Sequence, residues 1–290
     1  MIDPTRLERA LGEALSAQAL EDTPEGLACA LRYAVFPGGA RVRPRLLMAV
    51  AGANGDDHPS ITDAAGAAIE MLHCASLVHD DLPCFDGANL RRGKPSLHVA
   101  FGEPLAVLTG DALIVLAFQT LGVACAPAIE RLAPLLRIIG GGVGVPHGIV
   151  AGQAWECEED IPLSRYQQAK TGSLFAAATM AGAAAAGADP SQWNRLGQCI
   201  GEAYQVADDI LDANGDARKV GKPVGQDRQH DRPSAVREMG QAASAKRLRS
   251  LVEEAQDSIP ACPGETALRK QIARESEQFV KLALSCRAAA

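Results

Sequence analysis

Residues 77–98 read LVHDDLPCFDGANLRRGKPSLH, an apolar run that ends in a cluster of opposite charges. A helix over the apolar run would have to stop at Pro83, because proline cannot donate the next hydrogen bond. Three carboxylates and three cations lie around this stop: Asp80, Asp81, Asp86, Arg91, Arg92 and Lys94. Taken alone, such a cluster could be a solvated helix end with surface salt bridges.

A second acidic stretch, QVADDILD at residues 205–212, favours a functional site. Asp208 and Asp212 are four residues apart, so both carboxylates would leave the same face of a helix. Apolar neighbours flank them, and we expect them to point into the protein, where uncompensated carboxylates are costly. Two such clusters facing each other need cations between them, and magnesium combines carboxylates with substrate phosphates. Four basic residues complete a predicted magnesium–diphosphate site: Arg91, Arg92, Lys170 and Lys222.

Together, HDDLPCFD…LRRGKP and QVADDILD resemble the two aspartate-rich motifs of the trans-isoprenyl diphosphate synthases. The resemblance runs from about Tyr33 to Pro233 and is greatest to bacterial geranylgeranyl diphosphate synthases of carotenoid pathways. It implies an all-α prenyltransferase (isoprenoid synthase) helical bundle around a deep central cavity, and a homodimer. The implied reaction is head-to-tail condensation of isopentenyl diphosphate with an allylic diphosphate: dimethylallyl, geranyl or farnesyl.

The resemblance also implies a role for individual residues, with three Mg²⁺ ions bound when substrate is present. The metal-binding residues would be Asp80, Asp81, Asp86, Asp208, Asp209 and Asp212. Lys170 and five of these aspartates, all but Asp212, would form the catalytic group. Isopentenyl diphosphate would contact Arg43, His73 and Arg92. The other substrate-binding residues would be Arg91, Lys170, Thr171, Gln205, Lys222 and Arg232.

The sequence departs from the family pattern at three positions. Ala40 and Gln226 stand where the family usually has lysine. The family also has a GQ-x-x-D pattern, in which Gln153 matches the glutamine and Glu156 stands in place of the aspartate. Because a charged hydrogen bond to phosphate is strong, isopentenyl diphosphate should bind weakly unless Arg41 or another cation replaces the lysine at position 40. Glu156 is expected near the metals.

Small residues precede the first aspartate motif and predict the product length. Ala75 lies five residues before Asp80, about 7.5 Å along a helix, and Ser76 lies four before it. Some family members share the spacing of this first motif, Asp80-Asp81-x-x-x-x-Asp86. In those proteins, an aromatic residue at the position of Ala75 accompanies a farnesyl product. Its absence predicts geranylgeranyl diphosphate, with farnesyl diphosphate as the alternative.

Three other functions deserve comparison. A terpene cyclase shares the bundle but binds no second diphosphate, so Arg43, His73 and Arg92 would have no use. A carboxylate-bridged di-iron bundle requires Glu-x-x-His pairs, which the sequence lacks. A non-catalytic regulatory subunit of a heteromeric synthase would fit Ala40 and Gln226, but such subunits should have lost one aspartate motif.

Length and composition indicate which classes of protein the chain can belong to. Residues 1–290 are expected to form a single domain, and aromatic residues make up only 4% of it, which with abundant Ala and Leu favours helix. The net charge of −7 without a basic stripe argues against nucleic acid. The eight cysteines are scattered along the chain, as in a protein of the reducing cytoplasm. No uncharged apolar run is long enough to predict a membrane-spanning helix.

Helices are predicted over most of the chain: 3–20, 25–36, 61–82, 104–125, 128–139, 166–181, 241–257 and 264–287. Gly140–Gly144 is predicted to connect two helices, and residues 213–229 to form a flexible lid. Asp111, in an apolar helix, is expected to be bonded within the core.

Overall fold

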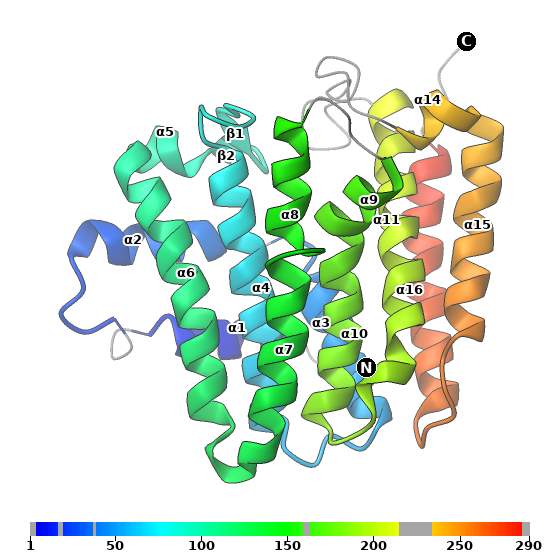
Figure 1. Cartoon of the computed structure of the whole chain (residues 1–290), viewed down its shortest axis with the longest axis horizontal. Helices are drawn as coiled ribbons and strands as arrows, with labels where there is room; N and C mark the ends of the chain where they lie inside the picture. Colours follow the sequence, from blue (N-terminus) through cyan, green and yellow to red (C-terminus); the bar gives the residue numbers. More distant parts are fainter. Residues whose placement is uncertain (1–3, 17–19, 37–38, 159–162, 215–233, 286–290) are drawn as a thin grey trace.

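The computed structural model describes residues 4–16, 20–36, 39–158, 163–214 and 234–285, and helices dominate it (Figure 1). The long helices are α3 Val42–Ala53, α4 Pro59–Asp80, α6 Glu103–Ala124, α7 Leu132–Val143, α10 Ser173–Ala185, α11 Asn194–Asn214, α15 Gln241–Asp257 and α16 Glu265–Ser285. The shorter ones are α1 Pro4–Ala14, α2 Glu25–Val35, α5 Leu97–Phe101, α8 Ile149–Ala154, α9 Leu163–Gln167 and α14 Ala235–Met239. A hairpin of β1 Leu90–Arg91 and β2 Lys94–Pro95 and the short helices η1 Ala126–Arg131, η2 Trp155–Cys157, η3 Gln168–Gly172 and η4 Pro190–Trp193 complete the fold.

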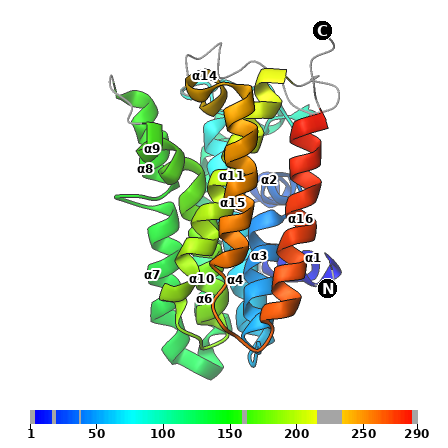
Figure 2. The ribbon, with the colours of Figure 1, turned by 90° about the vertical axis from the view of Figure 1, so that its right-hand side faces the viewer.

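The long helices run side by side as a bundle, and α1 and α2 cross one flank of it (Figures 1 and 2). α4 lies in the interior: proline at its first turn suits a helix start, and most of its side chains are buried. α4 and α11 end at the same end of the bundle, beside the β1–β2 hairpin and α14 (Figure 1). The two aspartate motifs are therefore at one end of the molecule, and the all-α class is confirmed.

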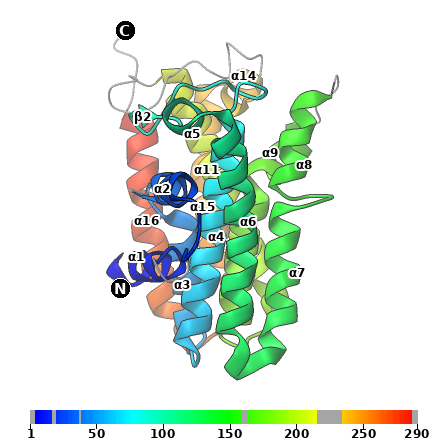
Figure 3. The same ribbon diagram turned by 90° about the vertical axis from the view of Figure 1, so that its left-hand side faces the viewer.

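α6 lies on the outside of the bundle, in front of α4 in Figure 3. Four of its aliphatic side chains are exposed: Val107, Leu108, Val115 and Val123. α4 and α6 are both long and apolar enough to cross a bilayer, but 78% of the apolar stretch of α4 is buried in the chain, against 33% for α6.

Three expectations about local structure are wrong. Residues 140–143 continue α7, because Gly142 packs closely on Ser173 and Ala177 of α10, and this contact compensates for the poor helix propensity of glycine. Asp111 is exposed on α6, with its Oδ1 3.8 Å from Nε2 of His79, since its helix is only half covered. The first helix ends at Ala14, well before residue 20.

Candidate active site

The first aspartate motif is a tight loop that returns to the end of α4. The backbone N–H of Asp86 donates to the carbonyl of Asp80 (3.0 Å), and the N–H of Gly87 donates to that of Leu82 (3.0 Å). Gly87 adopts a φ of 58°, which glycine accepts without a side-chain clash. The first motif, in which residues 82–85 separate Asp81 from Asp86, therefore folds back on itself and keeps Asp86 near Asp80.

A third carboxylate, from Glu156 in η2 directly after α8, joins Asp80 and Asp86. Oxygen atoms of the three side chains all lie within 4.8 Å of one another. Burial raises the pKa of the Asp80 carboxyl above its usual value; the Lys170 ammonium opposes this shift, and the charges of Asp86 and Glu156 add to it. Three converging carboxylates are a donor set that fits a hard divalent cation such as magnesium.

Lys170 bridges this carboxylate group. Its Nζ lies 2.5 Å from Oε1 of Glu156 and 3.6 Å from Oδ1 of Asp80. The residue belongs to η3, a π-helical turn between α9 and α10, and such turns are frequent at functional sites. Gly152 of α8 packs on the backbone of Lys170, where a Cβ atom would lie 2.5 Å from its N. This close approach brings α8, and hence Glu156, within reach of the ammonium.

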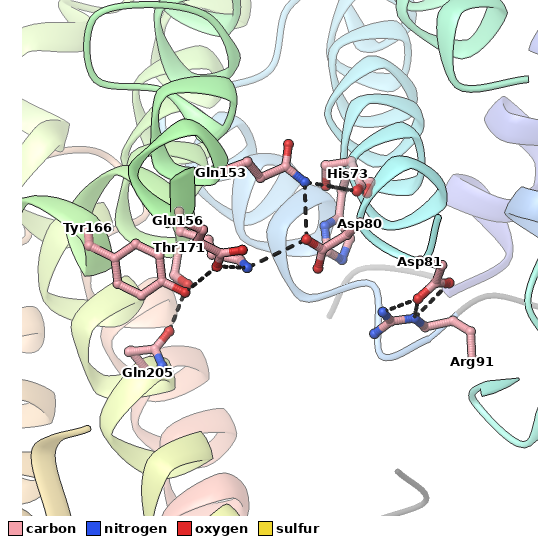
Figure 4. Close-up of polar contacts among 11 residues, drawn as sticks. His73, Asp80, Asp81, Arg91, Gln153, Glu156, Tyr166, Thr171 and Gln205 are labelled. Atoms are coloured by element: carbon pink, nitrogen blue, oxygen red, sulfur yellow. Dashed lines mark hydrogen bonds and ion pairs between the residues drawn. The ribbon is translucent and has the colours of Figure 1, made fainter. Parts of the chain in front are cut away.

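Two further side chains hold the group in place (Figure 4). Nε2 of Gln153 donates to the carbonyl of Ser76 (3.2 Å) and lies 3.4 Å from Oδ1 of Asp80. The Tyr166 hydroxyl donates to Oε1 of Glu156 (2.5 Å). Sequence reasoning missed Tyr166, since one hydroxyl at the start of a helix carries no recognisable signal.

Asp81 lies apart from the carboxylate group. It is buried and accepts hydrogen bonds from the guanidinium of Arg91, whose Nε is 3.1 Å from both carboxylate oxygens. Figure 4 shows this pair on the opposite side of Asp80 from Glu156. Glu156, and not Asp81, therefore completes the carboxylate group with Asp80 and Asp86.

In the second motif, Asp209 is the buried aspartate. It accepts hydrogen bonds from Nε2 of Gln205 (2.7 Å) and from the backbone N–H of Ala235 (2.7 Å), which ties α11 to α14. Asp208 is exposed and Asp212 half-buried, so both carboxylates are more accessible to solvent than their apolar neighbours in the sequence predict. With 3.6 residues per turn, Gln205 and Asp209 share the buried face of α11, and Asp208 lies beside that face, where it is accessible to solvent.

The polar network extends from Asp209 towards η3. Oγ1 of Thr171 donates to Oε1 of Gln205 (2.8 Å), so Thr171, Gln205 and Asp209 form one chain of hydrogen bonds. Three residues of the sequence prediction are therefore brought together. Lys222, Gln226 and Arg232, with residues 215–229 of the expected lid, lie outside the described residues.

A separate cluster of basic side chains lies at the start of α3. Nη1 of Arg43 is 3.3 Å from Nε2 of His73, and its guanidinium lies 4.5 Å from the Phe175 ring centroid. Burial, followed by the charges of Arg43 and Arg92, lowers the pKa of His73 well below its usual value. Nε of Arg43 is buried without a hydrogen-bond partner. The predicted group of Arg43, His73 and Arg92 thus occupies one region, and no carboxylate among the described residues forms an ion pair with it.

Arg41 cannot replace the lysine missing at position 40. Its guanidinium is buried and donates to Oε1 of Glu70 (2.7 Å), to Oε1 of Glu8 (2.9 Å) and to the carbonyl of Val35 (2.8 Å). A φ of 50° at Arg41 turns its side chain inward. Ala40 itself is exposed.

His79 was also missed, although it precedes Asp80. Its imidazole fills the space left by the absent side chain of Gly110 on α6, where an added Cβ would overlap the ring. Nε2 of His79 is 3.3 Å from the carbonyl of Val107. The contact fixes the last turn of α4, and thereby Asp80, against α6.

Known proteins resemble this chain over most of its length. The sequence pattern of the polyprenyl synthetases matches residues 24–264. A geranylgeranyl diphosphate synthase of Cereibacter sphaeroides is 52% identical over 97% of this chain and 98% of its own length. A farnesyl diphosphate synthase of Geobacillus stearothermophilus is 38% identical over 80% of this chain and 82% of its own.

Among solved structures, a geranyltransferase from Helicobacter pylori, complexed with magnesium and isoprenyl diphosphate, aligns with a TM-score of 0.77. It is 28% identical, and the alignment covers 97% of this chain and 98% of the other. The fold, the paired aspartate motifs and these similarities agree. The chain belongs to the polyprenyl synthetase family.

Proposed function

We propose that this protein condenses isopentenyl diphosphate head-to-tail with allylic diphosphates and releases geranylgeranyl diphosphate. The observation that carries the proposal is the converging group of Asp80, Asp86 and Glu156 with Lys170 between two of them. The relatives support the product: synthases named for geranylgeranyl diphosphate are 52% identical, against 38% for a farnesyl synthase.

The metal would be magnesium, as three ions with substrate bound. Asp80, Asp86 and Glu156 would hold ions from one side, and Asp208 and Asp212 from the other, with Asp81 and Asp209 as supporting carboxylates. When bound, the ions would supply positive charge where the leaving diphosphate becomes more negative.

The chain's own cations would add to this stabilisation. Lys170 is placed to leave Asp80 and Glu156 and to bind an oxygen of the allylic diphosphate, and Arg91 and Lys222 would contact the same group. Charge aimed at the departing diphosphate lowers the barrier to breaking the carbon–oxygen bond. Thr171 and Gln205, already hydrogen-bonded, would face the allylic carbons.

Arg43, His73 and Arg92 would bind the second substrate through its diphosphate. Its double bond then attacks the allylic cation and forms the new carbon–carbon bond. One proton leaves the adjacent carbon, with the released diphosphate as acceptor, and a new double bond forms. Apolar side chains around the allylic cation would exclude water from it.

A second copy of the chain would cover α6. Its exposed valine and leucine side chains form an apolar face of the kind that marks an interface, and Asp111 within this face would be costly in lipid. We extend the proposal to a cytoplasmic homodimer that supplies a carotenoid pathway.

The test is product analysis with magnesium, labelled isopentenyl diphosphate and, separately, dimethylallyl, geranyl and farnesyl diphosphates. A twenty-carbon product from all three starters is expected. Farnesyl diphosphate as the end product would favour the alternative synthase, and no elongation of any starter would contradict the proposed function.

A further inference from the structure

A small cavity lies between α2, the last turns of α4 and the β1–β2 hairpin. Its volume is about 140 Å³, and its lining includes three cations and one carboxylate: Arg91, Arg92, Lys94 and Asp81. Tyr33 of α2 and Phe36, directly after that helix, form an aromatic wall. The cavity therefore combines positive charge with a fixed, partly apolar boundary.

The positive charges exceed the negative one. The positive charge of Arg91 is balanced by the Asp81 carboxylate, to which its guanidinium donates hydrogen bonds. Across the described part of the chain, no carboxylate forms an ion pair with Arg92 or Lys94. A cavity with two unpaired cations is suited to an anion.

Arg92 joins this cavity to the Arg43–His73 cluster. Its guanidinium packs on Gly39, where a Cβ would lie 2.6 Å from Cζ, and its charge acts on both Arg43 and His73. An anion held by Arg43 and Arg92 would thus lie at the edge of the cavity that Lys94 lines.

Lys94 is held near this edge by weak contacts that allow it to move. Its Nζ lies 5.7 Å from the Tyr33 ring centroid, a cation–π contact that at an exposed site stabilises only modestly. The Tyr33 hydroxyl donates to the carbonyl of Pro95 (2.8 Å), which ties the hairpin to α2. The backbone is anchored, whereas the four-carbon side chain can turn towards a bound anion.

We propose that Lys94 binds the diphosphate of isopentenyl diphosphate together with Arg43 and Arg92. The inference rests on the proposed function and extends its substrate site. Lys94 supplies the cation that Ala40 does not provide and that Arg41, paired with Glu70 and Glu8, cannot provide.

The test compares Lys94→Ala with wild type in steady-state kinetics and in calorimetric binding of isopentenyl diphosphate alone. Loss of one charged hydrogen bond should raise KM and Kd for isopentenyl diphosphate about 10-fold or more. KM for farnesyl diphosphate, kcat and the circular dichroism spectrum should stay near wild type. Lys94→Arg should retain most of the affinity.

The matched control is Lys246→Ala, which removes an exposed lysine from α15 and should change neither constant. If Lys94→Ala leaves both constants for isopentenyl diphosphate unchanged, or raises only KM for farnesyl diphosphate, Lys94 does not bind this diphosphate. The KM comparison requires an active wild type, whereas the Kd comparison does not. A wild type that elongates no starter contradicts the proposed function instead.

Discussion

Arg41 shows how one residue can fix the backbone of a binding site without binding substrate. Its guanidinium connects Glu70 in α4, Glu8 in α1 and the carbonyl of Val35 at the end of α2. Two residues further along, Arg43 begins the basic cluster. Arg41 therefore sets the position from which α3 presents Arg43.

Arg41→Met should lower the free energy of unfolding by about 3–5 kcal/mol, because it leaves the buried Glu70 carboxylate without its partner. Urea unfolding at one protein concentration measures the change. Arg41→Met/Glu70→Leu removes both charges and should recover most of the loss. A single variant as stable as wild type would show that the pair contributes nothing.

Ala75 and Ser76 are the residues at which product length should change. Ala75 is 1% exposed in the apolar core, and Ser76, half-buried, has its carbonyl bonded to Gln153 beside Asp80. Ala75→Tyr should stop elongation at farnesyl diphosphate and leave ionisation intact, since the carboxylate group is untouched.

Product chromatography from labelled isopentenyl diphosphate decides this, with thermal unfolding to confirm that the tyrosine is accommodated. Ser76→Tyr, one residue closer to Asp80, is the companion variant if Ala75→Tyr does not fold. Geranylgeranyl diphosphate from folded variants at both positions, or farnesyl diphosphate from wild type, would refute this length control.

Among the elements, α8 and η3 define the site by how closely they pack. Gly152 allows the contact that brings Glu156 to Lys170. Gly152→Ala should push the two elements apart, cost about 1–3 kcal/mol of stability, and lower kcat more than either KM.

Steady-state kinetics and thermal unfolding would measure both effects. Gly140→Ala in α7 is the matched control, because a Cβ there meets nothing within 4 Å and alanine is the better helix former. It should keep full activity with equal or higher stability. Equal kinetics for the two variants would mean that the α8–η3 contact does not position Lys170.

For the whole molecule, the exposed face of α6 predicts the assembly. Leu108→Asp/Val115→Asp should convert a homodimer to monomers, because two charges would lie in the apolar interface. Sedimentation velocity at micromolar concentration reports the mass. Met239→Asp, an exposed apolar residue on α14, should leave the dimer intact. A monomeric wild type would contradict the proposed dimer.

The sequence predicted the class of fold well, because residues 61–82, 104–125 and 241–257 have the apolar content and the stop signals of helices. It also assigned to one site Asp80 and Asp86, which lie together in the structure, and Thr171 and Gln205, which are hydrogen-bonded. It could not assign which aspartate of each pair is buried, since helix rotation depends on packing. The partners of Asp81 and Asp209 therefore emerged only from the structure.

Local interruptions were equally beyond the sequence. Helix propensity predicts a break at the glycines of 140–144, yet packing of Gly142 on α10 keeps α7 helical. Arg41 was a possible replacement for the lysine missing at position 40, until the structure showed its pairing with Glu70, 29 residues away. Long-range contacts of this kind leave no trace in local spacing.

We expect the group of Asp80, Asp86 and Glu156 to drive ionisation of the allylic diphosphate. The decisive measurement is kcat of Asp80→Asn with farnesyl and isopentenyl diphosphates at saturating magnesium, beside the exposed-surface control Asp257→Asn. We predict a fall of at least about 100-fold for Asp80→Asn with an unchanged helical circular dichroism spectrum, and no fall for the control. Turnover of Asp80→Asn near that of wild type would contradict the account.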